Sequence, residues 1–422
     1  MRQYKDSGVE WIGKIPETWE YKRFKYSGVF EKGKLPDSSN IDKIGLPIIG
    51  ASEMLGKDAR TYTSDSSVPQ CKESDILILW DGANAGITAS GLNGVVSSTA
   101  VKFTCLDKCI LPKYAAYLLK YAEHYFKEKV SGTTIPHMNM AYINDIPLLC
   151  PQIVDQQRIA DYLDEKCGDI DSLIGLQEQM IEKLNAYKQS VITEAVTKGL
   201  DPNAKLVPSG IDWIGEIPEG WKIGRIKNVA SLFGRIGFRG YNSNDLNKEG
   251  VGAITLSPSN MLPMDMDYSA VTYLSWEKYF ESPEIMIQNG DLLYVKTGSS
   301  YGKVSYVHDL PREATINPQI LRIVPKINNK YLGYYMQSSL CEYQTKIGVV
   351  GGTIPTISQE KINNFWVLLP PDFESHTIAA YLDEKCTDID NLISLKQRKI
   401  DSLKEYKKSV IYEAVTGKTI IE

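Results

Sequence analysis

Two short stretches of this 422-residue chain carry residue types that could perform chemistry on a phosphodiester or a nucleotide. The pair Pro371-Asp372 precedes an Asp-Glu-Lys triplet at 383–385, in the order of a metal-dependent nuclease site. The triplet recurs at 164–166, but there Gln152 stands where the first Asp would be, so we assign no nuclease site. The sequence Gly-Lys-Thr at 417–419 resembles a phosphate loop but lacks its first glycine and is followed by only three residues.

Other candidate sites are equally incomplete. The string Asn-Pro-Gln-Ile at 317–320 lacks the second proline and the aromatic residue of an adenine methyltransferase motif. Cys105 and Cys109 form the only close cysteine pair, and none of the four histidines has metal-ligand spacing. The sequence therefore predicts no catalytic, metal or cofactor site on this chain.

The Asp-Glu-Lys triplet belongs to a long internal repeat. Residues 159–197 and 378–416 are identical at 25 of 39 positions, with a constant offset of 219. The phrase "SGVEWIGKIP" near the start returns as "SGIDWIGEIP" at residue 209, with an offset of 202. The chain thus consists of two variable segments, each followed by a repeated helical segment. The predicted boundaries are 1–152, 153–205, 206–371 and 372–422.

Each repeated segment carries apolar residues at alternating spacings of three and four, which is typical of a helix with a heptad seam. Such a seam could pack on any core, but two similar seams in one chain favour packing on each other, in antiparallel directions. Gln177 and Lys188 interrupt the first seam, and Lys396 and Lys407 interrupt the second. The predicted pairing residues are Ile174, Ile181, Leu184 and Val191, with Ile393, Ile400, Leu403 and Val410. Leucines 173, 176, 392 and 395 and tyrosines 187 and 406 should widen the seams, and Cys167 and Cys386 should be buried.

The variable segments show a mixed α/β pattern. Short β-like runs such as "LPIIGAS", "DILILW", "AITLS" and "DLLYVK" alternate with turn residues. Each segment also holds one amphipathic helix candidate near its end, at 113–130 and 330–347. The expected fold class is α+β: two α/β domains separated by two long helices that pair as an antiparallel coiled coil with a pseudo-twofold repeat.

The charge is unevenly distributed along the chain. The net charge is −5, and residues 151–207 hold six basic and ten acidic side chains. The variable segments are nearly neutral, so they could still present a basic face. No run of about 18 apolar residues is present, and the start "MRQYKDSGVEW" is too polar for a signal peptide, so we expect a cytoplasmic protein without a membrane span.

Taken in order, these parts resemble the specificity subunit of type I restriction-modification systems. The pattern "SGxxWIGxIPxxW" opens each half, "TIP" follows late in each variable segment, and each half closes on a helix ending "SVIxEAVT". The helix-opening Glu-Gln of the family appears here as Asp155-Gln156 and as Glu374-Ser375. The match covers the whole chain.

The resemblance implies a non-catalytic subunit. Each variable segment would be a target-recognition domain that reads one half of a split, asymmetric sequence in double-stranded DNA. The paired helices would space the half-sites, since about 25 helical residues span about 37 Å, close to one turn of B-DNA. They would also dock two adenine-N6 methyltransferase subunits and two restriction subunits. S-adenosylmethionine, ATP and Mg²⁺ would bind to those partners.

Base readout requires polar side chains on exposed loops, and phosphate contacts require basic side chains and backbone amides. In the first domain the candidates are Lys57, Arg60, Asn84, Ser98, Thr99, Lys102, Thr134, His137 and Asn139. In the second domain they are Arg235, Arg239, Tyr241, Lys296, Ser299, Tyr301 and Lys303, on glycine-rich stretches. Asp81 could in addition accept from cytosine N4.

Two other functions remain open from the residues alone. One is a protein–protein adaptor whose paired helices bind partners and whose domains read something other than DNA. The other is a self-sufficient DNA-modifying enzyme with an unfamiliar site.

Overall fold

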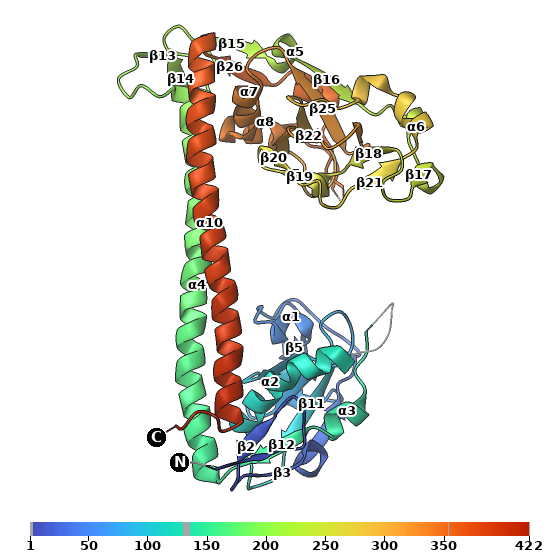
Figure 1. Cartoon of the computed structure of the whole chain (residues 1–422), viewed down its shortest axis with the longest axis vertical. Helices are drawn as coiled ribbons and strands as arrows, with labels where there is room; N and C mark the ends of the chain where they lie inside the picture. Colours follow the sequence, from blue (N-terminus) through green and yellow to red (C-terminus); the bar gives the residue numbers. More distant parts are fainter. Residues whose placement is uncertain (1–2, 130–135, 353, 422) are drawn as a thin grey trace. The chain divides into compact units, whose positions relative to one another are not determined.

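The chain forms two compact units in a computed structural model (Figure 1) that describes residues 3–129, 136–352 and 354–421. The first unit combines Met1–Glu178 with Gln397–Glu422, and the second is Gln179–Lys396. Each unit holds one variable domain together with parts of both long helices. Each domain corresponds to one of the two variable segments seen in the sequence.

The domain of the first unit is built on two four-stranded sheets, in the orders β4-β11-β8-β9 and β6-β5-β10-β7. The first sheet is antiparallel, and the second contains one parallel pair, β5 with β10. Its elements are β1 (Tyr4–Asp6), β2 (Lys14–Pro16), β3 (Glu20–Arg23), β4 (Gly28–Lys32), β5 (Leu46–Ile49), α1 (Ala51–Met54), β6 (Tyr62–Thr63), β7 (Gln70–Cys71), β8 (Ile76–Leu79), β9 (Thr88–Ser90), β10 (Gly94–Val96), β11 (Ala100–Cys105), α2 (Pro112–Lys129), α3 (Met140–Asn144) and β12 (Pro147–Cys150).

The domain of the second unit repeats the antiparallel sheet and the parallel pair of the first, but its fourth strand β17 pairs with β21 at the opposite edge of the second sheet. Its antiparallel sheet has the order β16-β25-β22-β23, and a second sheet, β17-β21-β18-β24, contains the parallel pair β18 with β24. Its elements are β13 (Leu206–Pro208), β14 (Glu216–Pro218), β15 (Lys222–Arg225), α5 (Ile226–Val229), β16 (Ala230–Gly234), β17 (Leu246–Asn247), β18 (Ala253–Leu256), β19 (Met261–Leu262), β20 (Asp265–Met266), β21 (Thr272–Leu274), α6 (Trp276–Phe280), β22 (Leu292–Val295), β23 (Val304–Tyr306), β24 (Ala314–Ile316), β25 (Ile320–Pro325), α7 (Asn329–Gln337), α8 (Ser339–Gly348), α9 (Gln359–Asn363) and β26 (Trp366–Leu369).

The repeated segments form two long helices, α4 (Ile153–Lys198) and α10 (Asp372–Val415). They run in opposite directions, since α4 begins in the first unit and ends in the second, whereas α10 does the reverse. The predicted antiparallel pair is therefore confirmed. The amino-terminal part of each long helix packs into a domain core. Leu163 of α4 and Leu382 of α10 are fully buried, and Cys167 and Cys386 are buried as predicted.

Two of the three lysines that interrupt the seams, Lys188 and Lys407, form ion pairs across the helices. Lys188 lies 2.6 Å from the Asp390 carboxylate in the second unit, and Lys407 lies 2.6 Å from Asp171 in the first. The offset of 219 relates the two pairs to each other. Of the predicted pairing residues, Val191, Ile400 and Val410 are buried, while Ile174, Ile181, Leu184, Ile393 and Leu403 are half-buried.

The phrase repeated at the start of each half forms a β-hairpin, β1-β2 in one unit and β13-β14 in the other. Ser7 and Ser209 hold the two turns in the same way, each donating its amide to a glycine carbonyl, Gly13 or Gly215. The tryptophan of the phrase then packs on the domain: the ring centroid of Trp11 lies 5.7 Å from that of Tyr125.

Two expectations differ from the structure. The helix expected over 330–347 is broken at Ser338, which ends α7 in an extended conformation and caps α8 by accepting from the amide of Cys341. The residues expected to widen the helix seams are instead exposed, because they lie on the outer face of the pair. They are Leu173, Leu176, Tyr187, Leu392, Leu395 and Tyr406.

Candidate nucleic-acid interface

Three loops that are distant in the sequence meet at one edge of the first domain. They are residues 80–87 after β8, residues 97–99 before β11, and residues 136–139 before α3. The amide of Trp80 donates to the Thr99 carbonyl at 2.8 Å, and the amide of Met138 donates to the Trp80 carbonyl at 2.9 Å. Backbone hydrogen bonds therefore fix the three loops against one another, and we call them the three-loop surface.

The second domain builds its three-loop surface with the same backbone hydrogen bonds, from residues 296–303, 317–319 and 355–358. Lys296 donates its amide to Gln319 at 2.8 Å, and Ile357 donates to Lys296 at 2.9 Å. The Gly82 amide donates to the Pro136 carbonyl at 3.0 Å, and the equivalent Gly298 amide donates to the Pro355 carbonyl, also at 3.0 Å. The frame of the two surfaces is thus the same, while the side chains on it differ.

Several predicted DNA-contacting residues come together on these surfaces. In the first domain Asn84, Thr99 and His137 are exposed, and Ser98 is half-buried beside them. In the second domain Ser299 is exposed, while Lys296, Tyr301 and Lys303 are half-buried. Burial lowers the pKa of the Lys296 ammonium. The residue Thr134 lies outside the described residues.

Other candidates of the first domain lie elsewhere or are already engaged. Lys57 and Arg60 are exposed in the segment after α1, outside the residues of the three loops. The Lys102 ammonium pairs with Glu31 at 2.7 Å and donates to the Gln70 carbonyl. The Asn139 side chain caps α3 by accepting from the amide of Ala141. These bonds favour a structural role for Lys102 and Asn139.

The predicted residues that follow β16 form a separate cluster. The Arg235 guanidinium is buried, donates to the Ile316 carbonyl and the Thr315 hydroxyl, and lies 5.2 Å from the centre of the Tyr241 ring. Burial lowers the pKa of the Arg235 guanidinium. Arg239 lies 3.4 Å from the Glu284 carboxylate. The placement of Arg235 favours a role in holding the loop rather than in touching DNA.

The sequence did not single out two residues that the structure places on or beside these surfaces, Gln319 and Lys32, and it gave no partner for Asp81. Gln319 is exposed on the loop that corresponds to Ser98 and Thr99. Asp81, weighed only as an acceptor from cytosine, also binds His137 at 2.6 Å and lies 3.6 Å from the Lys32 ammonium. Aligning the strands β11 and β25 by sequence would have brought Gln319 into view.

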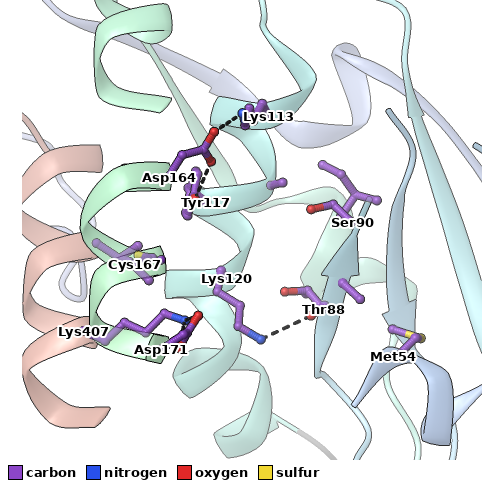
Figure 2. Close-up of a pocket in the computed structure, with 15 residues that line it drawn as sticks. Met54, Thr88, Ser90, Lys113, Tyr117, Lys120, Asp164, Cys167, Asp171 and Lys407 are labelled. Atoms are coloured by element: carbon purple, nitrogen blue, oxygen red, sulfur yellow. Dashed lines mark hydrogen bonds and ion pairs between the residues drawn. The ribbon is translucent and has the colours of Figure 1, made fainter. Parts of the chain in front are cut away.

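The repeated Asp-Glu-Lys triplet has a structural role at the junction of each domain with α4 or α10. Asp164 accepts from the Tyr117 hydroxyl at 2.7 Å and forms an ion pair with Lys113, as Figure 2 shows at the wall of a cavity of about 520 Å³. We call Lys113, Tyr117 and Asp164 an anchor cluster. The second unit has an equivalent anchor cluster of Lys330, Tyr334 and Asp383, with a Tyr–Asp distance of 2.8 Å.

The anchor clusters give the aspartate of each triplet, Asp164 or Asp383, a structural role. In each cluster, burial and the nearby carboxylate raise the pKa of the tyrosine, Tyr117 or Tyr334, so the hydroxyl keeps its proton and donates.

Among the described residues no group of three or more His, Cys, Asp or Glu side chains is placed to hold a metal ion. No helix within the described part of the chain is long and apolar enough to span a membrane.

Comparison with known proteins agrees with this architecture. The family model "Type I restriction modification DNA specificity domain" matches twice, at residues 16–186 and 218–405. The specificity subunit of the type I restriction enzyme MjaVIII of Methanocaldococcus jannaschii is 27% identical, with 99% of this chain and 97% of the relative covered. That of EcoBI of Escherichia coli is 22% identical, with 90% and 81% covered.

A solved chain from a study of complex assembly and conformational transition in a type I R-M system has the same fold. It superposes with a TM-score of 0.67 at 15% identity, covering 95% of this chain and 98% of that one. These matches favour the specificity subunit over the adaptor and the self-sufficient enzyme. The chain belongs to the family of type I restriction-modification specificity subunits and carries two DNA specificity domains.

Proposed function

We propose that each three-loop surface reads one half of a split, asymmetric sequence in double-stranded DNA. The observation that carries the proposal is that the two surfaces share the same backbone hydrogen bonds but present different side chains. The first domain presents Asp81, Thr99 and His137 where the second presents Thr297, Gln319 and Thr356. Histidine, glutamine and threonine side chains can hydrogen-bond to base edges, and different side chains at equivalent positions select different bases.

The exposed apolar residues of the long helices supply two matching docking patches. The first unit exposes Leu173, Leu176 and Tyr406, and the second exposes the equivalents Leu392, Leu395 and Tyr187. We infer an interface from their recurrence at equivalent positions of both units. Two equal patches suit two copies of one partner, which we take to be the adenine methyltransferase subunit.

The remaining parts of the system follow from this role. The covalent chemistry belongs to the partners, two methyltransferase and two restriction subunits, with S-adenosylmethionine, ATP and Mg²⁺ bound there. This chain contributes sequence recognition and assembly, and it works in the cytoplasm, where the host DNA is.

The deciding experiment is single-molecule mapping of methylated adenine in host DNA, with and without this gene and with the neighbouring genes intact. Loss of methylation at one split motif upon deletion is the expected result. Unchanged methylation would contradict the proposal. An adaptor would also fail to show the steep fall of DNA affinity with salt that phosphate contacts produce.

A further inference from the structure

The side chains of His137 and Asp81 form a rigid pair on the three-loop surface of the first domain. Their backbones face each other in an isolated antiparallel bridge, and the bonds from Gly82 to Pro136 and from Met138 to Trp80 flank it. The histidine Nδ1 lies 2.6 Å from Asp81 Oδ1. The imidazole is thus held at one edge, while more than half of its surface is exposed.

The carboxylate of Asp81 determines what the exposed edge of the ring can do. An ionised carboxylate can only accept a hydrogen bond, so the Nδ1 that faces it must carry the ring proton. In a neutral imidazole the other nitrogen then has a free lone pair and acts as an acceptor. Across the described residues the structure records no hydrogen bond at His137 Nε2, which leaves that lone pair available.

We propose that His137 selects a base carrying an exocyclic amino group, through acceptance by Nε2 in the major groove. Adenine N6 and cytosine N4 are the groups of this kind on the major-groove edge. This inference rests on the proposed function, because it assumes that the three-loop surface faces DNA. It assigns the selection to one position of the half-site that the first domain reads.

The surrounding charges support the assignment. The second carboxylate oxygen of Asp81, Oδ2, lies 3.6 Å from the Lys32 ammonium, which itself lies 5.8 Å from the centre of the Trp80 ring. Lys32 therefore neutralises the carboxylate that would otherwise repel DNA phosphates. In the second domain the equivalent bridge joins two threonines, Thr297 and Thr356. The second domain therefore presents hydroxyl groups, not an imidazole, at this position of its surface.

The substitution Asp81→Asn gives a sharp test, because Lys32 would orient the new amide. The amide oxygen would face the Lys32 ammonium, and the amide nitrogen would face His137 Nδ1 and donate to it. The ring proton would then move to Nε2, which would become a donor. The preferred base should change from adenine or cytosine to guanine or thymine, whose major-groove edges offer O6 or O4 as acceptors.

The experiment measures methylation of a duplex library randomised over both half-sites, by the complex of this chain with its methyltransferase subunits. It is run at about pH 8, above the ordinary histidine pKa of about 6.5. The unchanged protein should prefer an amino-bearing base at one position of the first half-site by about three- to tenfold. His137→Ala should abolish that preference, and Asp81→Asn should reverse it. The exposed Asp58→Asn, which removes a charge from the same domain, serves as the matched control.

The two half-sites make the outcomes separable. Retained reading of the second half-site shows that each variant is folded and assembled. If it is retained while His137→Ala or Asp81→Asn leaves every position of the first half-site unchanged, the assignment to His137 is wrong. If the unchanged protein directs methylation to no split motif, the proposed function itself fails.

Discussion

The guanidinium of Arg235 lies between β24 and the loop that follows β16. It donates to the Ile316 carbonyl at 3.1 Å, to the Thr315 hydroxyl at 2.9 Å and to the Arg239 carbonyl at 3.3 Å. A lysine cannot reach three acceptors in one plane. We therefore expect Arg235→Lys to lower the free energy of unfolding by about 1 to 3 kcal/mol, measured by urea denaturation.

The control for that substitution is Lys57→Ala in the other domain. Its side chain is exposed, so we expect a change in stability within about 0.5 kcal/mol. If Arg235→Lys leaves stability unchanged but weakens DNA binding, then the original prediction of a DNA contact is correct and the structural role is wrong.

The imidazole of His308 sits between two carboxylates, with Nε2 2.7 Å from Asp265 and Nδ1 3.0 Å from Asp309. Hydrogen bonding to Asp309, with a further contribution from Asp265, raises its pKa. A raised pKa stabilises the fold below the pKa of the unfolded chain, about 6.5, and that contribution is lost as the pH rises through the folded value.

We expect Asp265→Asn to lower the pKa of His308 and to flatten the pH dependence of stability above the ordinary histidine pKa of about 6.5. The free-energy effect should stay below about 1 kcal/mol, since the pair is well exposed. An NMR titration of the imidazole protons measures the pKa directly. If the pKa of His308 is the same in the variant, then Asp265 does not stabilise the protonated imidazole.

At the residue scale, the sequence could indicate polar residues on glycine-rich loops but not their partners. Asn84, Thr99 and His137 were predicted from three separate stretches, and only the folded sheet brings those stretches together. Arg235 has the residue type and the neighbours of a DNA contact, but its burial depends on strand β24, 80 residues away. Such long-range contacts leave no local pattern.

In each unit the long helices carry a lysine at a position where heptads favour an apolar residue, paired with an exposed aspartate of the other helix. Lys188 is largely buried, with 14% of its side chain exposed, and pairs with Asp390. Removing only the carboxylate, by Asp390→Asn, leaves a half-buried cation without its partner. We expect a loss of about 1 to 2 kcal/mol, measured by urea denaturation.

Replacing the lysine itself should behave differently. Lys188→Met puts an apolar side chain into an apolar seam and should leave stability unchanged or raise it. The exposed pair of Glu405 and Lys408 within α10 is the control, because Lys408→Gln should cost less than about 0.5 kcal/mol. A larger loss of unfolding free energy for Lys188→Met than for Asp390→Asn would contradict the prediction that an apolar side chain fits this position of the seam.

At the element scale, repetition made the helices predictable. The offset of 219 implied two equivalent helices, and the apolar spacing implied that they pair. The sequence also marked Lys188 and Lys407 as interruptions, but it could not assign their partners, Asp390 and Asp171. The prediction for the exposed leucines was wrong because apolar residues on the outer face of a helix follow the same helical period as those in the seam.

The proposed function makes the helices a ruler between the two half-sites. Inserting one heptad at the equivalent point of α4 and of α10 would lengthen each by about 10 Å. That length corresponds to about three base pairs at 3.4 Å each. We expect the gap in the methylated motif to grow by about three base pairs while both half-sites stay the same.

Methylation mapping of host DNA tests this insertion. Inserting the heptad in only one helix is the control, because it breaks the register of the pair and should abolish modification. An unchanged gap in the doubly lengthened protein would mean that the helices do not set the spacing.

The first unit is assembled from both ends of the chain. The Tyr4 hydroxyl donates to the Gly417 carbonyl at 3.2 Å, and the Tyr412 hydroxyl donates to the Ile12 carbonyl at 3.2 Å. Gly417 has a φ of +69°, and a Cβ at this position would lie 2.6 Å from Pro16. Only glycine therefore lets the end of α10 close on the first hairpin.

This arrangement sets an order of events during synthesis on the ribosome. The second unit is one continuous stretch, Gln179–Lys396, so it can fold as soon as it emerges. The first unit includes Gln397–Glu422, so the unit whose domain is translated first is completed only after α10 has been made. A premature stop after Lys396 would remove these residues from the first unit and leave the stretch that forms the second unit whole.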